Sequence, residues 1–243
     1  QPDRTIITYG LVDYISQRVR LDDFAFTLSS DSSAALRTVV EGQWLPSPGL
    51  TLFGSLKLSQ GLGAAGSVFS DVAGVPSTHD GARADFTKLN LTAGLNSQRG
   101  AVTASASLRG QISFGKPMFN SEQLGLEGGD APSSLSPRSY ALDEGVTLRG
   151  ELARSMPIGA SSDIAVLPYV FAAVGGGRLH NPTAVAAGSL RAANLGVELR
   201  LRLWRGLRDK QSLGLGLEYG KARIDTVETR QDSRLNLNLN GNF

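Results

Sequence analysis

The chain has 243 residues, with 24 Lys and Arg against 22 Asp and Glu, so its formal net charge is +2. It contains no cysteine, which excludes disulfides and thiolate sites for metals or catalysis. No run of about 18 apolar residues occurs, so a helical membrane span is excluded, whereas a barrel strand needs only about 10 residues of alternating hydrophobicity. The near-neutral charge does not favour a nucleic-acid partner, and none is expected.

Taken in chain order, the sequence predicts about ten β-strands and no helix, because apolar residues recur with a period of two rather than 3.6. Segment 23–31 either extends the second strand or belongs to the loop before it. The chain starts at "QPDRTIITYG" without a signal peptide, so we expect it to be processed or to be the C-terminal part of something longer. The predicted strands are 5–15, 33–45, 50–60, 84–96, 101–114, 146–156, 163–175, 189–204, 212–225 and 233–243.

The connections between these strands alternate in length. "PSPG" (46–49), "SQRG" (97–100), "PIGASS" (157–162) and "RGLRDKQ" (205–211) are short, whereas 61–84, 115–145 and 176–188 are long. The last connection, 226–232, departs from this rule because it is short where a long one is expected. Short turns at one end and long loops at the other are typical of outer-membrane barrels, in which the short turns are periplasmic.

The strands also have two different faces. Leu213, Leu215 and Leu217 alternate with Gly214, Gly216 and Glu218 in one strand, and other strands repeat the pattern. In a transmembrane barrel the apolar face contacts lipid and the polar face lines the lumen. The facing of 163–175 is left open. Residues predicted to bring charge into a lumen are Lys57, Arg109, Arg149, Glu151, Glu198, Arg200, Arg202 and Glu218.

The final strand, "RLNLNLNGNF", shows the alternation most clearly. Its leucines share one face with Phe243, and its asparagines share the other. A soluble sheet would point the asparagines outward, whereas a membrane barrel would point the leucines at lipid. Together with the loop lengths, the pattern favours an antiparallel transmembrane β-barrel over a soluble carbohydrate-binding sandwich. Trp44 and Trp204 each precede a short turn, where an interfacial aromatic girdle would lie.

The text "PMFNSEQLGLEGG…SPRSYALDEGVTLRGELARSMP" resembles the outer-membrane two-partner secretion transporters (haemolysin secretion/activation proteins). Further matches are "LPYVFAAVGGGRL", "LGLGLEYGKAR" and the terminal Phe243. The resemblance implies a sixteen-stranded barrel of which this chain supplies about ten strands. Ten is also an even number that could close alone. The resemblance also implies that residues 115–145 form a plug-like loop folded into the lumen.

The resemblance assigns residues in and after this loop. Ser121, Glu122 and Gln123 match the loop entrance, and Gly128 with Gly129 matches a glycine pair. Arg138, Ser139 and Tyr140 match the gating tip, with Ser where the family has Gly. Asp143, Glu144 and Gly145 match the start of the next strand. The family carries an acid that pairs with the tip Arg where this chain has Ala172 and Ala173, so Glu151, Glu198 or Glu218 would take that role or the lock is altered.

The resemblance further implies export of a secreted partner protein across the bacterial outer membrane, without a nucleotide or any other cofactor. Outer-membrane lipid and the barrel-assembly machinery are the other expected partners, and Phe243 would be the assembly signal. A passive porin, a surface-binding barrel and a barrel-assembly insertase are the alternatives. No catalytic or metal site is expected, because His79 and His180 both lie in long loops and no GxSxG, HExxH or phosphate-binding motif occurs.

Overall fold

The computed structural model describes residues 3–21, 26–63, 81–135, 140–159, 164–183, 186–205, 212–226 and 229–242. Among these, eleven strands form one antiparallel sheet, ten of them in the path β1-β2-β3-β4-β5-β8-β10-β11-β12-β13, with the short β9 paired to β10. The strands are β1 (Arg4–Leu21), β2 (Phe26–Ser47), β3 (Leu50–Gly61), β4 (Thr87–Arg99), β5 (Val102–Ile112), β8 (Glu144–Arg154), β9 (Met156–Pro157), β10 (Ala165–Arg178), β11 (Ser189–Arg205), β12 (Ser212–Asp225) and β13 (Thr229–Asn242). The prediction of an antiparallel all-β chain is confirmed.

The ten predicted strands correspond one to one with the ten strands of this path. The first two are longer than predicted, because β1 runs to Leu21 and β2 begins at Phe26, so residues 26–31 of segment 23–31 extend the second strand. β4 is shifted toward the C-terminus and starts at Thr87. Each strand pairs with the next strand along the chain, apart from the interruption by the elements between β5 and β8.

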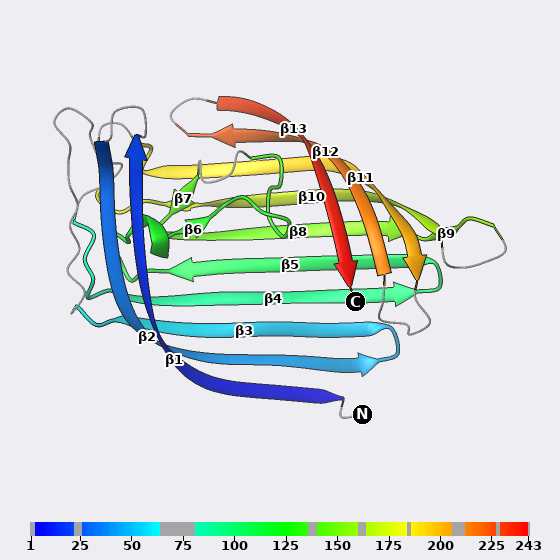
Figure 1. Cartoon of the computed structure of the whole chain (residues 1–243), viewed down its shortest axis with the longest axis horizontal. Coiled ribbons are helices and arrows are strands. Elements are labelled where there is room, and N and C mark those ends of the chain that lie inside the picture. The colour runs from blue at the N-terminus through cyan, green and yellow to red at the C-terminus, as the bar shows by residue number, and fades with distance from the viewer. Residues whose placement is uncertain are drawn as a thin grey trace.

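The connections lie at two opposite ends of the sheet (Figure 1). At the turn end, β2 and β3 are joined through Gly49 (φ +78°), and β4 and β5 are joined through Gly100 (φ +59°). These positive φ angles suit glycine, which has no Cβ to clash. The long connections gather at the other end, here called the loop end. The alternation of loop lengths in the sequence therefore corresponds to the two ends of the sheet.

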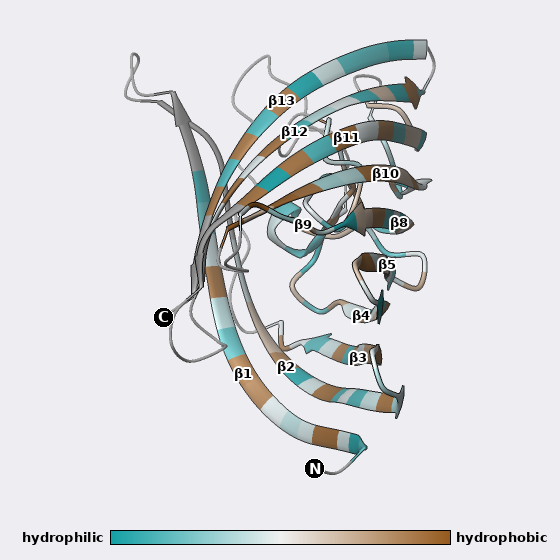
Figure 2. Ribbon diagram, turned by 90° about the vertical axis from the view of Figure 1, so that its right-hand side faces the viewer, coloured by the Kyte–Doolittle hydropathy of each residue, from teal (hydrophilic) through white to brown (hydrophobic). Residues whose placement is uncertain are grey.

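The sheet is strongly curved, and its concave side faces the segment between β5 and β8 (Figure 2). Within the described part of the chain the sheet is open, since β1 pairs only with β2 and β13 only with β12. No helix of the described residues is long and apolar enough to cross a membrane.

The two faces of the sheet follow the alternation that the sequence predicts. Leucines of β13 point to the convex side, where Leu237 is 71% exposed. On β10, which the sequence leaves open, Phe171 and Ala173 are buried on the concave side, while Val170 and Val174 are exposed on the convex side. Small apolar residues occupy both faces of this strand, so hydropathy alone does not separate them.

Candidate functional site

The candidate site is the contact between the concave face and residues 113–143, here called the inner loop. Between β5 and β8 the chain forms a 3-10 helix, η2 (Asn120–Glu122), and two short strands, β6 (Leu124–Gly125) and β7 (Ala141–Leu142), which pair with each other. Side chains from the concave face reach this loop along most of its length. The sequence predicts a long loop over 115–145, and the structure places the described residues of this segment against the polar face of the sheet (Figure 2).

Glu122 is the most densely bonded carboxylate of the inner loop, and it is 1% exposed. Arg37 of β2 donates from Nη2 to its Oε1 at 2.8 Å and from Nη1 to its Oε2 at 3.1 Å. Lys88 of β4 places Nζ 2.7 Å from Oε2 of the same carboxylate. Both cations are themselves buried. One loop carboxylate thus pairs with two buried cations, each from a different strand, and Asp13 supplies Arg37 with a second carboxylate.

The surroundings of Glu122 hold it further in place. Lys88 Nζ donates to the Glu122 carbonyl oxygen at 2.7 Å, and Gln111 Nε2 of β5 donates to the same oxygen at 2.9 Å. Arg37 also donates to Ser59 of β3 and to Asp13 of β1. Burial alone would raise the pKa of Glu122, but the hydrogen bond from Arg37 and the charge of Lys88 hold it below its ordinary value. The carboxylate is therefore kept ionised.

Asp143, predicted as part of the strand start, joins both ends of the inner loop. It is fully buried and accepts hydrogen bonds from the backbone N–H of Met118 at 2.9 Å and from Gln123 Nε2 at 3.0 Å. Its second oxygen accepts from the backbone N–H of His180, in the connection between β10 and β11, at 2.7 Å. One carboxylate thereby ties together three segments at the loop end.

Its neighbour Glu144 lies on the convex side at the start of β8. Oε1 accepts from the backbone N–H of Ser113 at 3.2 Å and of Gly115 at 3.0 Å, and Oε2 accepts from Arg178 at 2.8 Å. Gly145, the last of the predicted strand-start residues, pairs with Gln111 of β5 and Gly177 of β10. Asp143 and Glu144 thus fix the points where the inner loop leaves and rejoins the sheet.

Arg149 of β8 is the centre of a second buried group and is 2% exposed. Its guanidinium donates to Glu151 at 2.7 Å, to Glu218 of β12 at 2.9 Å and to the hydroxyl of Ser133 in the inner loop at 2.8 Å. It also lies 3.9 Å from the ring centroid of Phe171. The guanidinium therefore uses both its charge and its flat face.

Two more predicted lumen residues adjoin this group. Arg200 of β11 donates to both oxygens of Glu198, at 2.6 and 2.7 Å, and lies 3.9 Å from the ring centroid of Tyr169. It is also 3.6 Å from Glu151. These side chains form one network on the concave face, contributed by β8, β11 and β12. Its members are Arg149, Glu151, Glu198, Arg200 and Glu218.

Arg109 and Lys57 lie elsewhere on the concave face. Arg109 donates to the carbonyl oxygens of Gly125 and Glu127 at 3.0 and 3.1 Å, and approaches Asp130 at 3.4 Å. Lys57 lines a cavity of about 480 Å³ beside Arg37, Lys88 and Glu122. Within the described part of the chain Lys57 has no ion pair. The cavity therefore holds one cation that the inner loop does not neutralise.

The sequence did not single out several residues that bind the inner loop. Asn194 donates to Ser134 Oγ at 2.8 Å, Arg234 donates to the Leu135 carbonyl oxygen at 3.1 Å, and Asn236 donates to the Ser133 carbonyl oxygen at 3.4 Å. Strand parity could have identified them as concave residues, because all of them fall on the polar face of a predicted strand. The same holds for Arg37 and Lys88. What the sequence could not show is that a distant loop supplies their partners.

An apolar cluster completes the contact near the loop end. Leu126, Leu135 and Leu142 of the inner loop pack with residues of β11 and β12, and the partly buried Tyr140 packs against this cluster. Tyr140 is the one member of the predicted tip that the structure describes. The sheet residues in this cluster are Leu190, Ala192, Ala222 and Ile224.

Several predicted residues lie outside the described ones. These are Arg138 and Ser139 of the tip, His79, Phe243, and the side chains of Arg202 and Trp204. Ala173 is concave and Ala172 convex, and the three acids considered as substitute partners already bind Arg149, Arg200 or both. Pairing of the tip with one of these acids stays a prediction.

The described residues contain no group of three or more His, Asp or Glu side chains placed to hold a metal ion. Comparison with protein-family models finds no match for this sequence, and comparison with curated proteins finds none either. The similarity to two-partner secretion transporters therefore stays a prediction based on the residues quoted above.

Proposed function

We propose that this chain forms the C-terminal strands of an outer-membrane β-barrel that exports a partner polypeptide, with the inner loop as its gate. The observation that carries the proposal is the inner loop itself, held across a charged concave face by ion pairs and hydrogen bonds. The resemblance of the sequence to two-partner secretion transporters supplies the class of cargo. No cofactor takes part, and folding of the cargo outside the cell would bias its direction.

The convex face supports the membrane location. Its described side chains are uncharged from Val146 to Leu152 on β8, from Ala193 to Leu201 on β11 and from Ser233 to Leu239 on β13. On β8 this run lies between Glu144 and Arg154, which is about 33 Å along the strand at about 3.3 Å per residue. A tilt of about 40° reduces this to about 25 Å, the height of the apolar band of an outer-membrane barrel.

The chemistry of the inner-loop contact suits a gate. Much of the contact is polar, so water and the side chains of a passing polypeptide can replace the bonds that the loop gives up. A contact made only of apolar side chains would expose its whole area to water on opening. The remaining concave face would carry mixed charge, which solvates an extended chain without binding one sign of charge tightly.

The test replaces residues 118–140 of the full-length protein by a short Gly-Ser linker, which keeps Asp143 and Glu144 at the start of β8. We expect larger single-channel conductance in planar bilayers, because the lumen loses its obstruction. Conductance equal to that of the unaltered protein would contradict the gate.

Secretion separates export from passive diffusion. Deleting the whole gene for this protein should abolish appearance of a co-expressed partner polypeptide in the medium, and supplying the gene again should restore it. Normal secretion in the deletion strain, combined with a conducting barrel, would instead assign the protein to passive porins.

A further inference from the structure

Exposed cations on the convex side lie at both ends of the uncharged band, and at the loop end four of them lie on three neighbouring strands. At the loop end of β10, β11 and β12, four exposed basic side chains point to the convex side, directly beside the uncharged band. On the strands before β8, the convex positions at this end are Arg18 on β1 and the uncharged Ser32, Gln60, Thr87 and Ile112 on β2, β3, β4 and β5. The four basic residues, here called the basic border, are Arg178, Arg191, Lys221 and Arg223.

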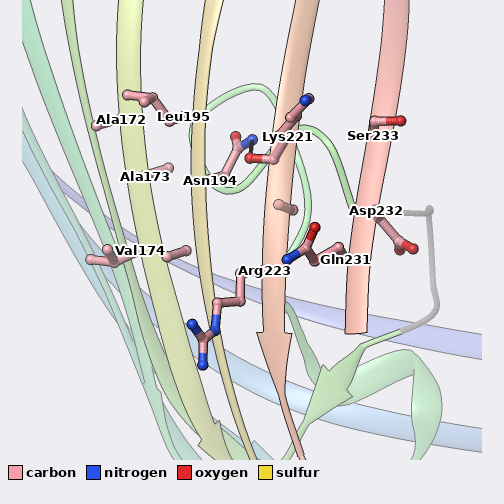
Figure 3. Close-up of a pocket in the computed structure, with 12 residues that line it drawn as sticks. Ala172, Ala173, Val174, Asn194, Leu195, Lys221, Arg223, Gln231, Asp232 and Ser233 are labelled. Carbon is pink, nitrogen blue, oxygen red and sulfur yellow. Dashed lines mark hydrogen bonds between the residues drawn. The ribbon is translucent and has the colours of Figure 1, made fainter. Parts of the chain in front are cut away.

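Strand register brings these cations close together. Lys221 and Arg223 are two residues apart on β12 and therefore share a face. Arg223 pairs with Ala193 and Arg191 pairs with Asp225, so Arg191 and Arg223 occupy successive convex positions of adjacent strands. Figure 3 shows Lys221 and Arg223 on β12, with Gln231 and Ser233 on the neighbouring strand.

The basic border is only partly neutralised. Arg223 pairs with Asp225 at 3.1 Å and Arg178 with Glu144 at 2.8 Å. Within the described part of the chain, Arg191 and Lys221 have no carboxylate within ion-pair distance. Four cations against two carboxylates leave a local charge of +2, and Asp232, which lines one groove, pairs with Arg230 at 3.4 Å.

Two adjoining grooves lie over this region, with volumes of about 690 and 860 Å³. Both are lined by Val174 and Ala193 at their apolar side and by residues of the basic border at the loop end. A ligand that fits both parts has an anionic head and an apolar body.

We propose that the basic border binds the phosphate headgroup of an anionic lipid in the leaflet nearest the long loops. The acyl chains would lie along Val174, Ala193 and Leu195, which continue into the uncharged band. This assignment rests on the proposed membrane location. Excess positive charge attracts phosphate, and the adjacent apolar surface distinguishes a lipid from a soluble anion. An acidic protein segment would pair with the cations but would leave the apolar walls of the grooves uncovered.

The experiment compares two lipids with identical acyl chains, phosphatidic acid and phosphatidylcholine, mixed in equal amounts with the full-length protein in neutral detergent. Native mass spectrometry measures which lipid stays bound. The test variant is Arg191→Gln with Lys221→Gln and Arg223→Gln. The matched control, Arg4→Gln with Arg99→Gln and Arg154→Gln, removes three convex cations at the turn end.

We expect the unaltered protein and the control to retain phosphatidic acid preferentially. The test variant should lose this preference by at least about fivefold, the factor that one cation near a membrane surface supplies. Equal retention of both lipids by the unaltered protein would overturn the proposal. An equal loss in the control would also overturn it, because it would indicate a general effect of border charge. Stronger retention of an added polyglutamate peptide would overturn it as well, because it would indicate a protein partner.

Failure of the lipid site and failure of the barrel are distinguishable in the same samples. A folded barrel migrates differently on semi-native gels before and after heating. A heat-modifiable protein without lipid preference overturns only the basic border. A protein whose migration does not change on heating overturns the membrane location as well.

Discussion

At the residue scale, Glu122 has the clearest energetic role. It forms ion pairs with Arg37 and Lys88 at a site where all three side chains are buried. A buried charge without its partner is costly, about 3–5 kcal/mol when one member of a buried pair is removed. The position of the inner loop therefore depends strongly on Glu122, alongside the hydrogen bonds made by Asp143 and Arg149.

We predict that Glu122→Gln releases the inner loop from the concave face. Glutamine keeps the shape but leaves buried Lys88 without a carboxylate and Arg37 with Asp13 alone, so the docked state of the loop should be destabilised by about 3–5 kcal/mol. Hydrogen exchange of the backbone amides in 118–135 should become faster. Asp130→Asn is the control, because Asp130 is half exposed and its pair with Arg109 is long, at 3.4 Å. Equal exchange rates in Glu122→Gln and the unaltered protein would contradict the prediction.

The lowered pKa of Glu122 gives the same contact a pH dependence. A carboxyl group with a depressed pKa stabilises the docked loop fully above its ordinary value of 4.5. That stabilisation is lost as pH falls through the depressed value, because the docked state then has to bind a proton. We expect amide exchange in 118–135 to accelerate below pH 4.5 after correction for the intrinsic rate. Glu122→Gln should show no such acceleration, and the same acid response in both proteins would place its origin elsewhere.

At the element scale, the strands were predictable from local patterns. Alternation of apolar and polar residues fixes which side chains share a face, and the short turns at Gly49 and Gly100 fix where neighbouring strands reverse. β10 shows where this reasoning ends, because alanine and glycine on both faces give no contrast in hydropathy. Its facing follows from pairing with β8 and β11, which is information from outside the strand.

The inner loop was predictable only in outline. Its length and its polar ends are visible in the sequence, and Asp143 and Glu144 were singled out there through the resemblance. The partners of Glu122 were not, because Arg37 and Lys88 are distant in the chain and resemble ordinary charges on a polar strand face. Contacts between a loop and a distant strand depend on the curvature of the whole sheet.

At the scale of the whole molecule, the contrast between the two faces of the sheet is the dominant property. The convex side combines a continuous uncharged band with charged borders at both ends, whereas the concave side holds the ion-pair networks. The sequence predicts this contrast from parity alone. It does not reveal the partners of the outer edges of β1 and β13, because strand parity gives the face of a side chain and not the neighbour of a strand.

We predict that the two faces of β13 respond oppositely to charge. Leu237→Lys places an ammonium group in the uncharged band and should destabilise the barrel in membranes by about 2–4 kcal/mol. Asn238→Lys, one residue away, faces the concave side and should have little effect. The heat-modifiable fraction on semi-native gels, measured against urea concentration in vesicles, checks both. Equal loss in the two variants would argue against a lipid-facing convex side.

The reach of the inner-loop contacts has a consequence for the order of folding. Glu122 bonds to Arg37, 85 residues before it, and Ser133 accepts from Asn236, 103 residues after it. The first bond requires β2 in the sheet and the second requires β13, so the complete set of loop contacts forms only after the strands assemble. Contacts made after the rate-limiting step slow unfolding without accelerating folding. The inner loop would therefore act on the lifetime of the assembled protein, while the strands alone set the speed at which it forms.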